Sequence, residues 1–451
     1  MLSSYDSPEE ELQAAAIYGA ADRAERLLIM GADPDMRDKD GHTPLHLAAN
    51  NKNEHLVELL VKYKANVNSV GRQKGRSPLW YASRHNCTGS IAMLLSAGAH
   101  VNLQDLDGVS ALHIAVKHTH TEGVEQLLAH SEIDVNLENK FGQTPLHEAA
   151  KMGNTAIVGM LLFQAANPDA VDRWLNTPLM YAALHNHKNT VAFLLQANCD
   201  VNKVNKGLRT ALHTACRNGH ADVVGLLIQA GAKLDLADSE GNTPVLLAGR
   251  YQYSGIMKAL IEAGCDVHHR DMSKKSLFHF AALSGNEELV QCLLSLQANP
   301  DLADENDNTP LMLAIRRNHV TIVRALLLRN CNIHRCLHSA GVTWDPLSLT
   351  IKHGYPQLVP MLVRAGCDLK AFPALVGTNK ISTDISSDPF LLSWLDAVTK
   401  NPCRLRQQCR ITVRRTLSCD IQREVQQLTL PQSLKEYLLL DDLDHGFVPD
   451  L

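Results

Sequence analysis

The chain has 451 residues, which is long for one ordinary globular core and favours several domains or an array of repeats. Hydrophobic residues make up 45% of the sequence and aromatic residues only 5%, which favours short helices packed through leucine and alanine. The 48 Asp and Glu residues outnumber the 43 Lys and Arg residues, so we do not expect nucleic acid as the main partner.

The N-terminal residues 1–11 are polar and acidic, and no run of 18 or more apolar residues occurs in the sequence. We therefore expect neither secretion nor a membrane-spanning segment, and no membrane partner. The eleven cysteines are scattered singly without a CxxC pair, which is typical of reduced thiols in the cytosol or nucleus. The expected location is the cytoplasm, with the nucleus as the alternative.

A four-residue phrase, such as Thr43-Pro44-Leu45-His46, recurs along most of the chain at steps of 33 or 34 residues. Its copies begin at Thr43, Ser77, Ser110, Thr144, Thr177, Thr210, Thr243, Ser276 and Thr309. A degenerate copy follows at Asp345, and residues 11–15 keep the apolar pattern without the Thr-Pro. The period predicts eleven repeats over about residues 8–371.

Each phrase predicts the start of a first helix, because the Thr or Ser hydroxyl can accept from first-turn amides and Pro has no amide to satisfy. A second helix follows, marked by paired leucines such as Leu59-Leu60, and ends at a residue such as Gly31 that takes the left-handed conformation. Tight turns such as residues 38–41 then predict a short hairpin finger. Since one repeat cannot bury its own apolar face, the repeats must stack into a solenoid.

This unit resembles the ankyrin repeat over residues 8–371, which implies an all-α ankyrin-repeat solenoid with short hairpin fingers. The turn position that usually holds glycine is occupied here by Leu175, Leu208, Lys274 and Asp307. In the family, histidine at the fourth motif position bonds to backbone of the next repeat. The resemblance implies that role, rather than catalysis or metal binding, for His46, His113, His147, His213 and His279.

Four cysteines occupy the slot after a helix-ending Gly or Asn, where alanine is usual, and we interpret them as buried small hydrophobic residues. They are Cys199, Cys265, Cys331 and Cys367. Cys331, His334, Cys336 and His338 also suggest zinc, but their spacing matches no familiar site, and only three extra residues near them leave it open. We expect no metal and no cofactor. Without a GxxxxGK[ST], GxSxG or HExxH motif, we expect no enzymatic activity.

Ankyrin arrays bind partners through finger tips and exposed parts of the inner helices. The candidate substrate-binding residues here are Arg173 and Trp174 on one finger, His185 after the next inner helix, and Arg250 and Tyr251 after a later one. Trp, Tyr and Arg dominate the energetics of protein interfaces. For Trp174 two interpretations stay open: an indole exposed for a partner, or one folded back onto the neighbouring finger.

The period stops after residue 371. Residues 372–400 are expected to form a linker with a short docking helix, residues 401–440 a small helical domain, and residues 441–451 an acidic tail. As a helix, the segment around Leu405, Cys409 and Val413 places these three residues on one face, because they are spaced four apart. This narrow apolar stripe is shaped to enter a groove of a partner.

The C-terminal domain resembles a SOCS box. Its elongin-binding box, Leu-xxx-Cys-xxx-aliphatic, is matched by Leu405, Cys409 and Val413. Its cullin box, usually Leu-Pro-aliphatic-Pro, is matched by Leu428, Leu430 and Pro431, whereas Thr429 replaces the first proline. That departure leaves open how strongly a cullin binds.

The whole chain resembles the ankyrin-repeat and SOCS-box family. The resemblance implies a non-catalytic substrate receptor of a ubiquitin ligase, in which elongin C and elongin B bind the Leu405 helix and cullin-5 with its RING subunit docks beside it. The solenoid would hold a target protein for ubiquitination and degradation, by raising the local concentration of its lysines. The alternative is an ankyrin scaffold whose C-terminal helices only cap the last repeat.

Overall fold

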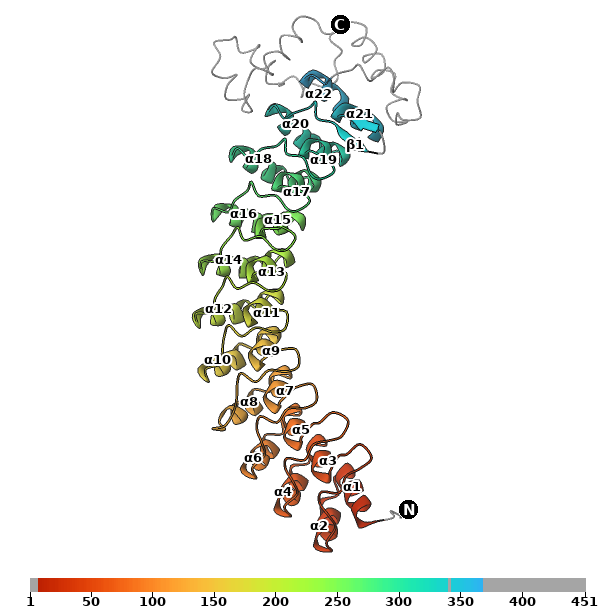
Figure 1. The fold of residues 1–451 in the computed structure, drawn as a ribbon, viewed down its shortest axis with the longest axis vertical. Coiled ribbons are helices and arrows are strands. Elements are labelled where there is room, and N and C mark those ends of the chain that lie inside the picture. The colour runs from red at the N-terminus through yellow and green to blue at the C-terminus, as the bar shows by residue number, and fades with distance from the viewer. Residues whose placement is uncertain (1–6, 340–341, 368–451) are drawn as a thin grey trace, which may run out of the picture. The chain divides into compact units, whose positions relative to one another are not determined.

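The computed structural model describes residues 7–339 and 342–367, and its helices follow one another in pairs along the chain (Figure 1). The chain divides into two compact units, Met1–Lys233 and a second unit that begins at Leu234. In each pair an inner helix begins at the recurrent phrase and an outer helix returns beside it. The two units are described separately below.

The N-terminal unit contains seven helix pairs within the described residues. Its inner helices are α1 (Pro8–Tyr18), α3 (Pro44–Asn50), α5 (Pro78–Arg84), α7 (Ala111–Lys117), α9 (Pro145–Met152), α11 (Pro178–Leu184) and α13 (Ala211–Asn218). Its outer helices are α2 (Ala21–Ile29), α4 (Glu54–Lys62), α6 (Thr88–Ser96), α8 (Thr121–Leu128), α10 (Thr155–Phe163), α12 (Lys188–Gln196) and α14 (Ala221–Gln229). Each inner helix packs on the next inner helix, and each outer helix on the next outer helix, so the apolar core runs through the unit as a continuous strip.

The C-terminal unit contains four further pairs within the described residues. Its inner helices are α15 (Pro244–Arg250), α17 (Leu277–Ser284), α19 (Pro310–Arg316) and α21 (Pro346–His353), and its outer helices are α16 (Ser254–Glu262), α18 (Glu287–Ser295), α20 (Val320–Leu328) and α22 (Leu358–Ala365). Two short antiparallel strands, β1 (Leu337–Ser339) and β2 (Val342–Trp344), precede α21. The predicted helical solenoid is confirmed, and this hairpin is an addition to it where the sequence is stretched.

The inner helices begin as the recurrent phrase predicts. Thr43 adopts an extended conformation and forms a reciprocal capping box with His46, and Ser110 does the same with His113. In the first of these, the Thr43 amide donates to His46 Nδ1 at 3.1 Å, and His46 Nε2 lies 3.0 Å from the carbonyl oxygen of Arg76 in the next repeat. Since the carbonyl can only accept, Nε2 carries the proton and the imidazole is neutral.

The predicted role of the fourth-position histidines is confirmed for four of the five. His113, His147 and His279 repeat the arrangement of His46, with Nε2 placed 3.0, 3.1 and 3.2 Å from the backbone carbonyl oxygens of Gln143, Asn176 and Asn308. His213 makes the same Nδ1 contact to its own cap, Thr210. Burial lowers the pKa of His46 and of His279 to about 4, because the charged form would lose its water.

Most fingers are organised by an Asp or Asn at the first position, whereas the finger of residues 71–76 begins at Gly71. Asp172 is typical: its carboxylate accepts from the amides of Trp174 and Asn176 at 2.9 and 2.8 Å, which closes the turn. Neighbouring fingers are then joined by one backbone hydrogen bond each, such as Arg173 N–H to the Phe141 carbonyl at 2.9 Å. We call this series of bonds the finger ladder. Only two isolated bridges of strand type accompany it in the described fingers, so the fingers are mostly turns rather than regular hairpins.

Four residues hold the turn position that usually carries glycine. Leu175, Leu208, Lys274 and Asp307 have φ angles of 61°, 56°, 59° and 59°, which is the left-handed region that glycine enters at little cost. The turn is therefore kept although the residue is not glycine.

The cysteine prediction is confirmed for Cys265, Cys331 and Cys367, which are buried, whereas Cys199 is only half-buried. Burial, followed by nearby aspartates, raises the pKa of the Cys199 and Cys265 thiols to about 12.

No helix in the described part of the chain combines the length and the apolar character that crossing a membrane requires. The elongin-binding residues Leu405, Cys409 and Val413 and the cullin-box residues Leu428, Leu430 and Pro431 lie outside the described residues.

Candidate functional site

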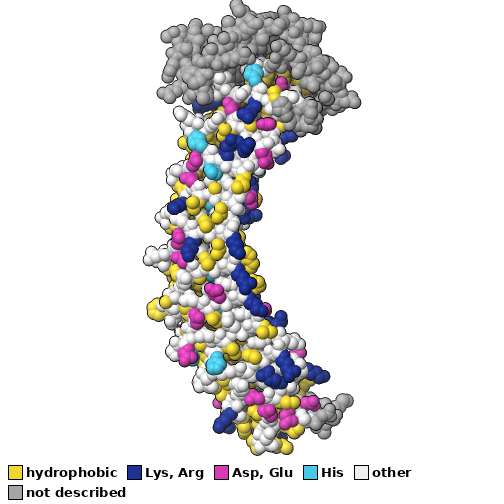
Figure 2. All heavy atoms as spheres, viewed as in Figure 1, with side chains coloured by type: hydrophobic (Ala, Val, Ile, Leu, Met, Phe, Trp, Pro, Cys, Tyr) yellow, Lys and Arg dark blue, Asp and Glu magenta, His cyan; other side chains and the backbone are white. Residues whose placement is uncertain are grey.

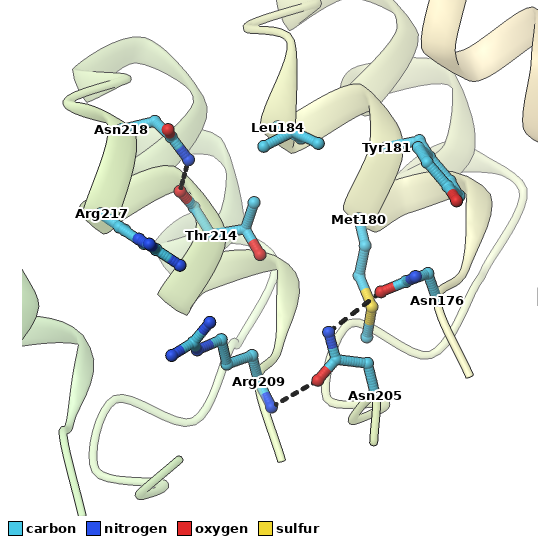
Figure 3. A pocket seen from close by; sticks show the side chains of 9 residues that line it. All are labelled: Asn176, Met180, Tyr181, Leu184, Asn205, Arg209, Thr214, Arg217 and Asn218. Atoms are coloured by element: carbon cyan, nitrogen blue, oxygen red, sulfur yellow. Dashed lines mark hydrogen bonds between the residues drawn. The ribbon is translucent and has the colours of Figure 1, made fainter. Parts of the chain in front are cut away.

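A groove with a volume of about 420 Å³ lies between α11 and α13 of the N-terminal unit (Figure 3). Met180, Tyr181 and Leu184 of α11 line one wall, and Thr214, Arg217 and Asn218 of α13 line the other. The fingers that precede these helices contribute Asn176, Asn205 and Arg209. The wall is therefore apolar on one side and rich in amide and guanidinium donors on the other, which suits a peptide segment with acceptors.

The groove opens where the motif histidine is missing. Met180 occupies the fourth position of its repeat, and a thioether has no N–H with which to bond the carbonyl of the next finger. Histidine is also missing from the fourth position of an earlier repeat, where Trp80 replaces it. A second cavity of about 600 Å³ lies beside Trp80. There Arg76 stacks over the Trp80 ring, with 3.9 Å from its guanidinium carbon to the ring centroid.

Tyr181 fixes one wall of the groove to the finger. Its hydroxyl donates to the buried Asp172 carboxylate at 2.7 Å and accepts from the Gln143 side-chain amide at 3.0 Å. Burial, together with the hydrogen bond and negative charge of Asp172, raises the pKa of Tyr181 to about 12. The phenol therefore stays neutral at physiological pH and acts as a fixed support.

The predicted pair Arg173 and Trp174 lies at the tip of the finger that leads into α11. The Trp174 ring stacks on Phe141 of the preceding finger, with ring centroids 6.0 Å apart and an angle of 18° between the planes. Trp174 is nevertheless 49% exposed and Phe141 51% exposed. Both interpretations thus hold in part: the indole folds back onto its neighbour, and the stacked pair still offers an apolar face to solvent.

His185 follows the other end of α11, away from the finger. It is exposed, and its ring lies 6.0 Å from that of His187, which reaches the Lys151 carbonyl through Nε2 at 2.9 Å. Burial, followed by the positive charges of His187 and Lys151, lowers the pKa of His185. Trp174 and His185 are thus at opposite ends of one inner helix rather than in a single cluster.

Arg250 and Tyr251 belong to the C-terminal unit and are already engaged within it. Arg250 pairs with the buried carboxylate of Asp271 at 3.0 Å and with Glu240 at 3.4 Å. Tyr251 is 42% exposed and stacks on Tyr253 at 6.4 Å between centroids. The pairing of Arg250 could not be predicted from the sequence, because its partners are 10 and 21 residues away and meet it only through the finger register.

The tentative zinc residues do not form a ligand cluster in the described part of the chain. Cys331 is buried, Cys336 Sγ lies 3.5 Å from the backbone oxygen of His334, and the side chain of His338 is outside the described residues. The described residues contain one group of suitable geometry, Asp38, Asp40 and His42 in a finger. The Asp38 carboxylate accepts the amides of Asp40 and His42 in its own turn, and the Asp40 carboxylate accepts from the Gln73 side chain of the next finger.

The ankyrin-repeat family model matches residues 12–105, 93–172, 112–205, 179–271 and 277–372, and the SOCS-box model matches residues 401–439. The chain belongs to the ankyrin-repeat and SOCS-box proteins. In this family the SOCS box implies a substrate receptor of an elongin–cullin ubiquitin ligase, and the ankyrin repeats imply protein binding. Both domains are of adaptor type rather than catalytic.

Curated relatives resemble this family member only through their repeats. The chain is 31% identical over 167 residues to the nuclear factor NF-kappa-B p105 subunit of Gallus gallus, a match over 36% of this chain and 17% of that protein. It is 30% identical over 169 residues to rabankyrin-5 of Homo sapiens, over 32% of this chain and 14% of the relative. It is 34% identical over 138 residues to neurogenic locus notch homolog protein 1 of Xenopus tropicalis, a match over 31% of this chain and 5% of that protein. The chain thus spans a small part of these proteins.

Proposed function

We propose that this protein is the substrate receptor of an elongin B/C–cullin-5–RING ubiquitin ligase, and that it directs a bound target protein to degradation. The SOCS-box match at residues 401–439, directly after the ankyrin matches, carries the proposal. Leu405, Cys409 and Val413 would seat in elongin C, and Leu428, Leu430 and Pro431 would contact the cullin. No chemistry is needed from this chain, since its contribution is proximity.

The target would bind along the fingers and inner helices of the solenoid. The groove between α11 and α13 and the exposed Trp174 support this placement, because Met180 and Leu184 give the groove an apolar wall and the Trp174 ring is about half exposed. Arg173, His185 and Tyr251 remain candidate contacts, whereas Arg250 would first have to leave Asp271. We place the complex in the cytoplasm, with the nucleus as the alternative.

Co-precipitation of elongin C tests the proposal. The variant Leu405→Ala/Cys409→Ala should co-precipitate at least tenfold less elongin C than wild type, because two apolar anchors of one helix face are removed. Arg406→Ala, predicted to lie on the opposite face, is the matched control and should retain it. If wild type binds no elongin C, or the double variant binds it equally, the chain is an ankyrin scaffold whose last helices only cap the stack.

A second test addresses the departure in the cullin box. Thr429→Pro restores the family pattern Leu-Pro-aliphatic-Pro and pre-orders the turn by fixing its φ angle. We expect cullin-5 recovery with the elongin complex to rise several-fold while elongin C recovery stays constant. Equal cullin-5 recovery from both proteins would show that Thr429 does not limit docking.

A further inference from the structure

The tips of three consecutive fingers in the N-terminal unit form a surface that the family assignment does not explain. They comprise residues 140–142, 173–175 and 206–208, and we call them the tip ridge. The finger ladder holds them in register through backbone hydrogen bonds of 2.9–3.0 Å. The amides of Lys140, Arg173 and Lys206 donate to the carbonyl oxygens of Asp107, Phe141 and Trp174, respectively. Equivalent side chains therefore recur once per finger.

The first property of the tip ridge is positive charge. Lys140, Arg173 and Lys206 occupy the same ladder position and all three are exposed. None of them makes an ion pair within the described residues. Figure 2 shows Lys and Arg side chains following one another along the finger edge at the level of α9–α13. Asp107, on the finger before Lys140, marks where the positive run begins.

The second property is exposed apolar surface between these cations. Phe141 and Trp174 are stacked and about half exposed, and Leu175 and Leu208 are 42% and 50% exposed. Exposed large apolar side chains that are grouped, rather than scattered singly, mark interaction sites.

The third property is backbone strain without a local benefit. Leu175 and Leu208 have φ angles of 61° and 56°, whereas the equivalent residue of the preceding finger is Gly142, with a φ of 73°. A leucine in this conformation is disfavoured by contact of its Cβ with the backbone, and its exposed side chain gains little burial in return. Leu175 and Leu208 therefore place large apolar side chains at a turn position where the backbone favours glycine.

We propose that the tip ridge binds an extended acidic segment of the target protein, with an apolar residue beside each acidic one. This inference rests on the proposed function, because it names the class of segment that the receptor recognises. Packed helix layers are about 8–10 Å apart, and an extended chain in the polyproline II conformation rises about 3.1 Å per residue and places every third side chain on the same face. A segment lying along the ridge therefore meets a new finger every three residues, with acids at positions i, i+3 and i+6.

Fluorescence anisotropy with the full-length chain and three labelled peptides tests this proposal. The first peptide carries Glu at every third position with Leu after each Glu, the second has the same composition with its Glu residues contiguous, and the third has Gln for Glu. The first should bind at least tenfold more tightly than the third and several-fold more tightly than the second, and its binding should weaken with added salt. Equal affinity for all three peptides would overturn the proposal.

Variants of the ridge supply the matched controls. Lys140→Glu/Arg173→Glu/Lys206→Glu should weaken binding of the first peptide at least tenfold. The same charge change on exposed lysines of outer helices, Lys62→Glu/Lys188→Glu/Lys258→Glu, should leave it unchanged. If both triple variants weaken peptide binding equally, binding depends only on the net charge of the protein, and the tip ridge is not a binding site.

Leu208→Gly separates a binding role from a structural one. Its melting temperature should equal or exceed that of wild type, because glycine relieves the left-handed strain, whereas its affinity for the first peptide should fall. Unchanged affinity would exclude Leu208 from the site. Elongin C recovery from the same variants should stay at the wild-type level, so failure of peptide binding and failure of the ligase assignment give different results.

Discussion

The fingers of the two units are built on the same frame but present different side chains. In the C-terminal unit the finger ladder continues, with Met272 N–H to Glu240 and Glu305 N–H to Ser273 carbonyl oxygens at 3.0 and 2.9 Å. Where the N-terminal tips carry Lys140, Arg173 and Lys206, these tips carry Ser239, Met272 and Glu305. Because the ladder uses backbone atoms only, tip chemistry diverges while the turn is preserved.

The buried aspartates at the head of the fingers show the second difference. Asp172 is held by neutral donors, namely two backbone amides, the Tyr181 hydroxyl and the Asn176 side-chain amide. Asp271 instead pairs with the Arg250 guanidinium at 3.0 Å. The tip-ridge finger heads Asn139, Asp172 and Asn205 therefore use no cation, although Arg76 pairs with Asp105 at 3.6 Å in the finger before them. The cations of the tip ridge stay available to a partner.

The largest expected effect comes from removing a finger head. Asp172→Ala leaves two amides and a phenol without their acceptor and should lower the local opening free energy by about 3 kcal/mol. Asp172→Asn keeps the Oδ1 acceptor of the two amides, as Asn139 and Asn205 do in the neighbouring fingers, but loses the Oδ2 acceptor of Tyr181, and should cost about 1 kcal/mol. Asp271→Asn removes the counter-ion of Arg250 and should cost about 2 kcal/mol. Hydrogen exchange of finger amides measures all three, and equal losses for the two Asn variants would break the comparison.

Acid should affect both units alike, because the capping histidines belong to the shared frame. The unfolded chain binds a proton on each histidine near pH 6.5 and the folded chain only near pH 4 for His46 and His279, so stability falls as the pH drops through this window. At pH 5 each histidine should cost about 2 kcal/mol relative to pH 7.

The matched variant is His279→Met, since Met180 and Met312 occupy the same slot in other repeats. This variant should abolish the acid sensitivity of amide hydrogen exchange around α17 and leave the acid sensitivity around α3 unchanged. His268→Met, at an exposed position, serves as control. Persistence of the acid effect around α17 would assign it to a different group.

The smallest effect concerns the four non-glycine turn residues. Glycine at Leu175, Leu208, Lys274 or Asp307 should raise stability by at most about 1 kcal/mol, because relief of strain is partly offset by a more flexible unfolded chain. Denaturant unfolding should show similar gains in both units, whereas weaker binding of the acidic peptide should follow only from the two N-terminal changes. Lost peptide binding from Lys274→Gly would contradict the division between units.

The sequence was sufficient for features that depend on local spacing. The caps at Thr43 and Ser110 follow from the recurrent phrase, whereas the histidine cross-links and the turn at Leu175 follow from the resemblance to the ankyrin repeat. Features that join side chains of different fingers could not be foreseen, since the period does not say which rings or charges meet. The Trp174 stack on Phe141 and the Arg250 pair with Asp271 are of this kind.

Met180 has a consequence for the receptor without cargo. Where a motif histidine bonds to the next repeat, the junction gains a buried hydrogen bond; the junction after α11 lacks this bond and is held instead by Asn205 bonded to Asn176 and His220 bonded to the Leu184 carbonyl. A target bound across α11 and α13 would contact both sides of this junction and, by mass action, stabilise its folded state. Target binding would then stabilise the receptor while the target is ubiquitinated. A receptor without a target would unfold locally more often and would be degraded first.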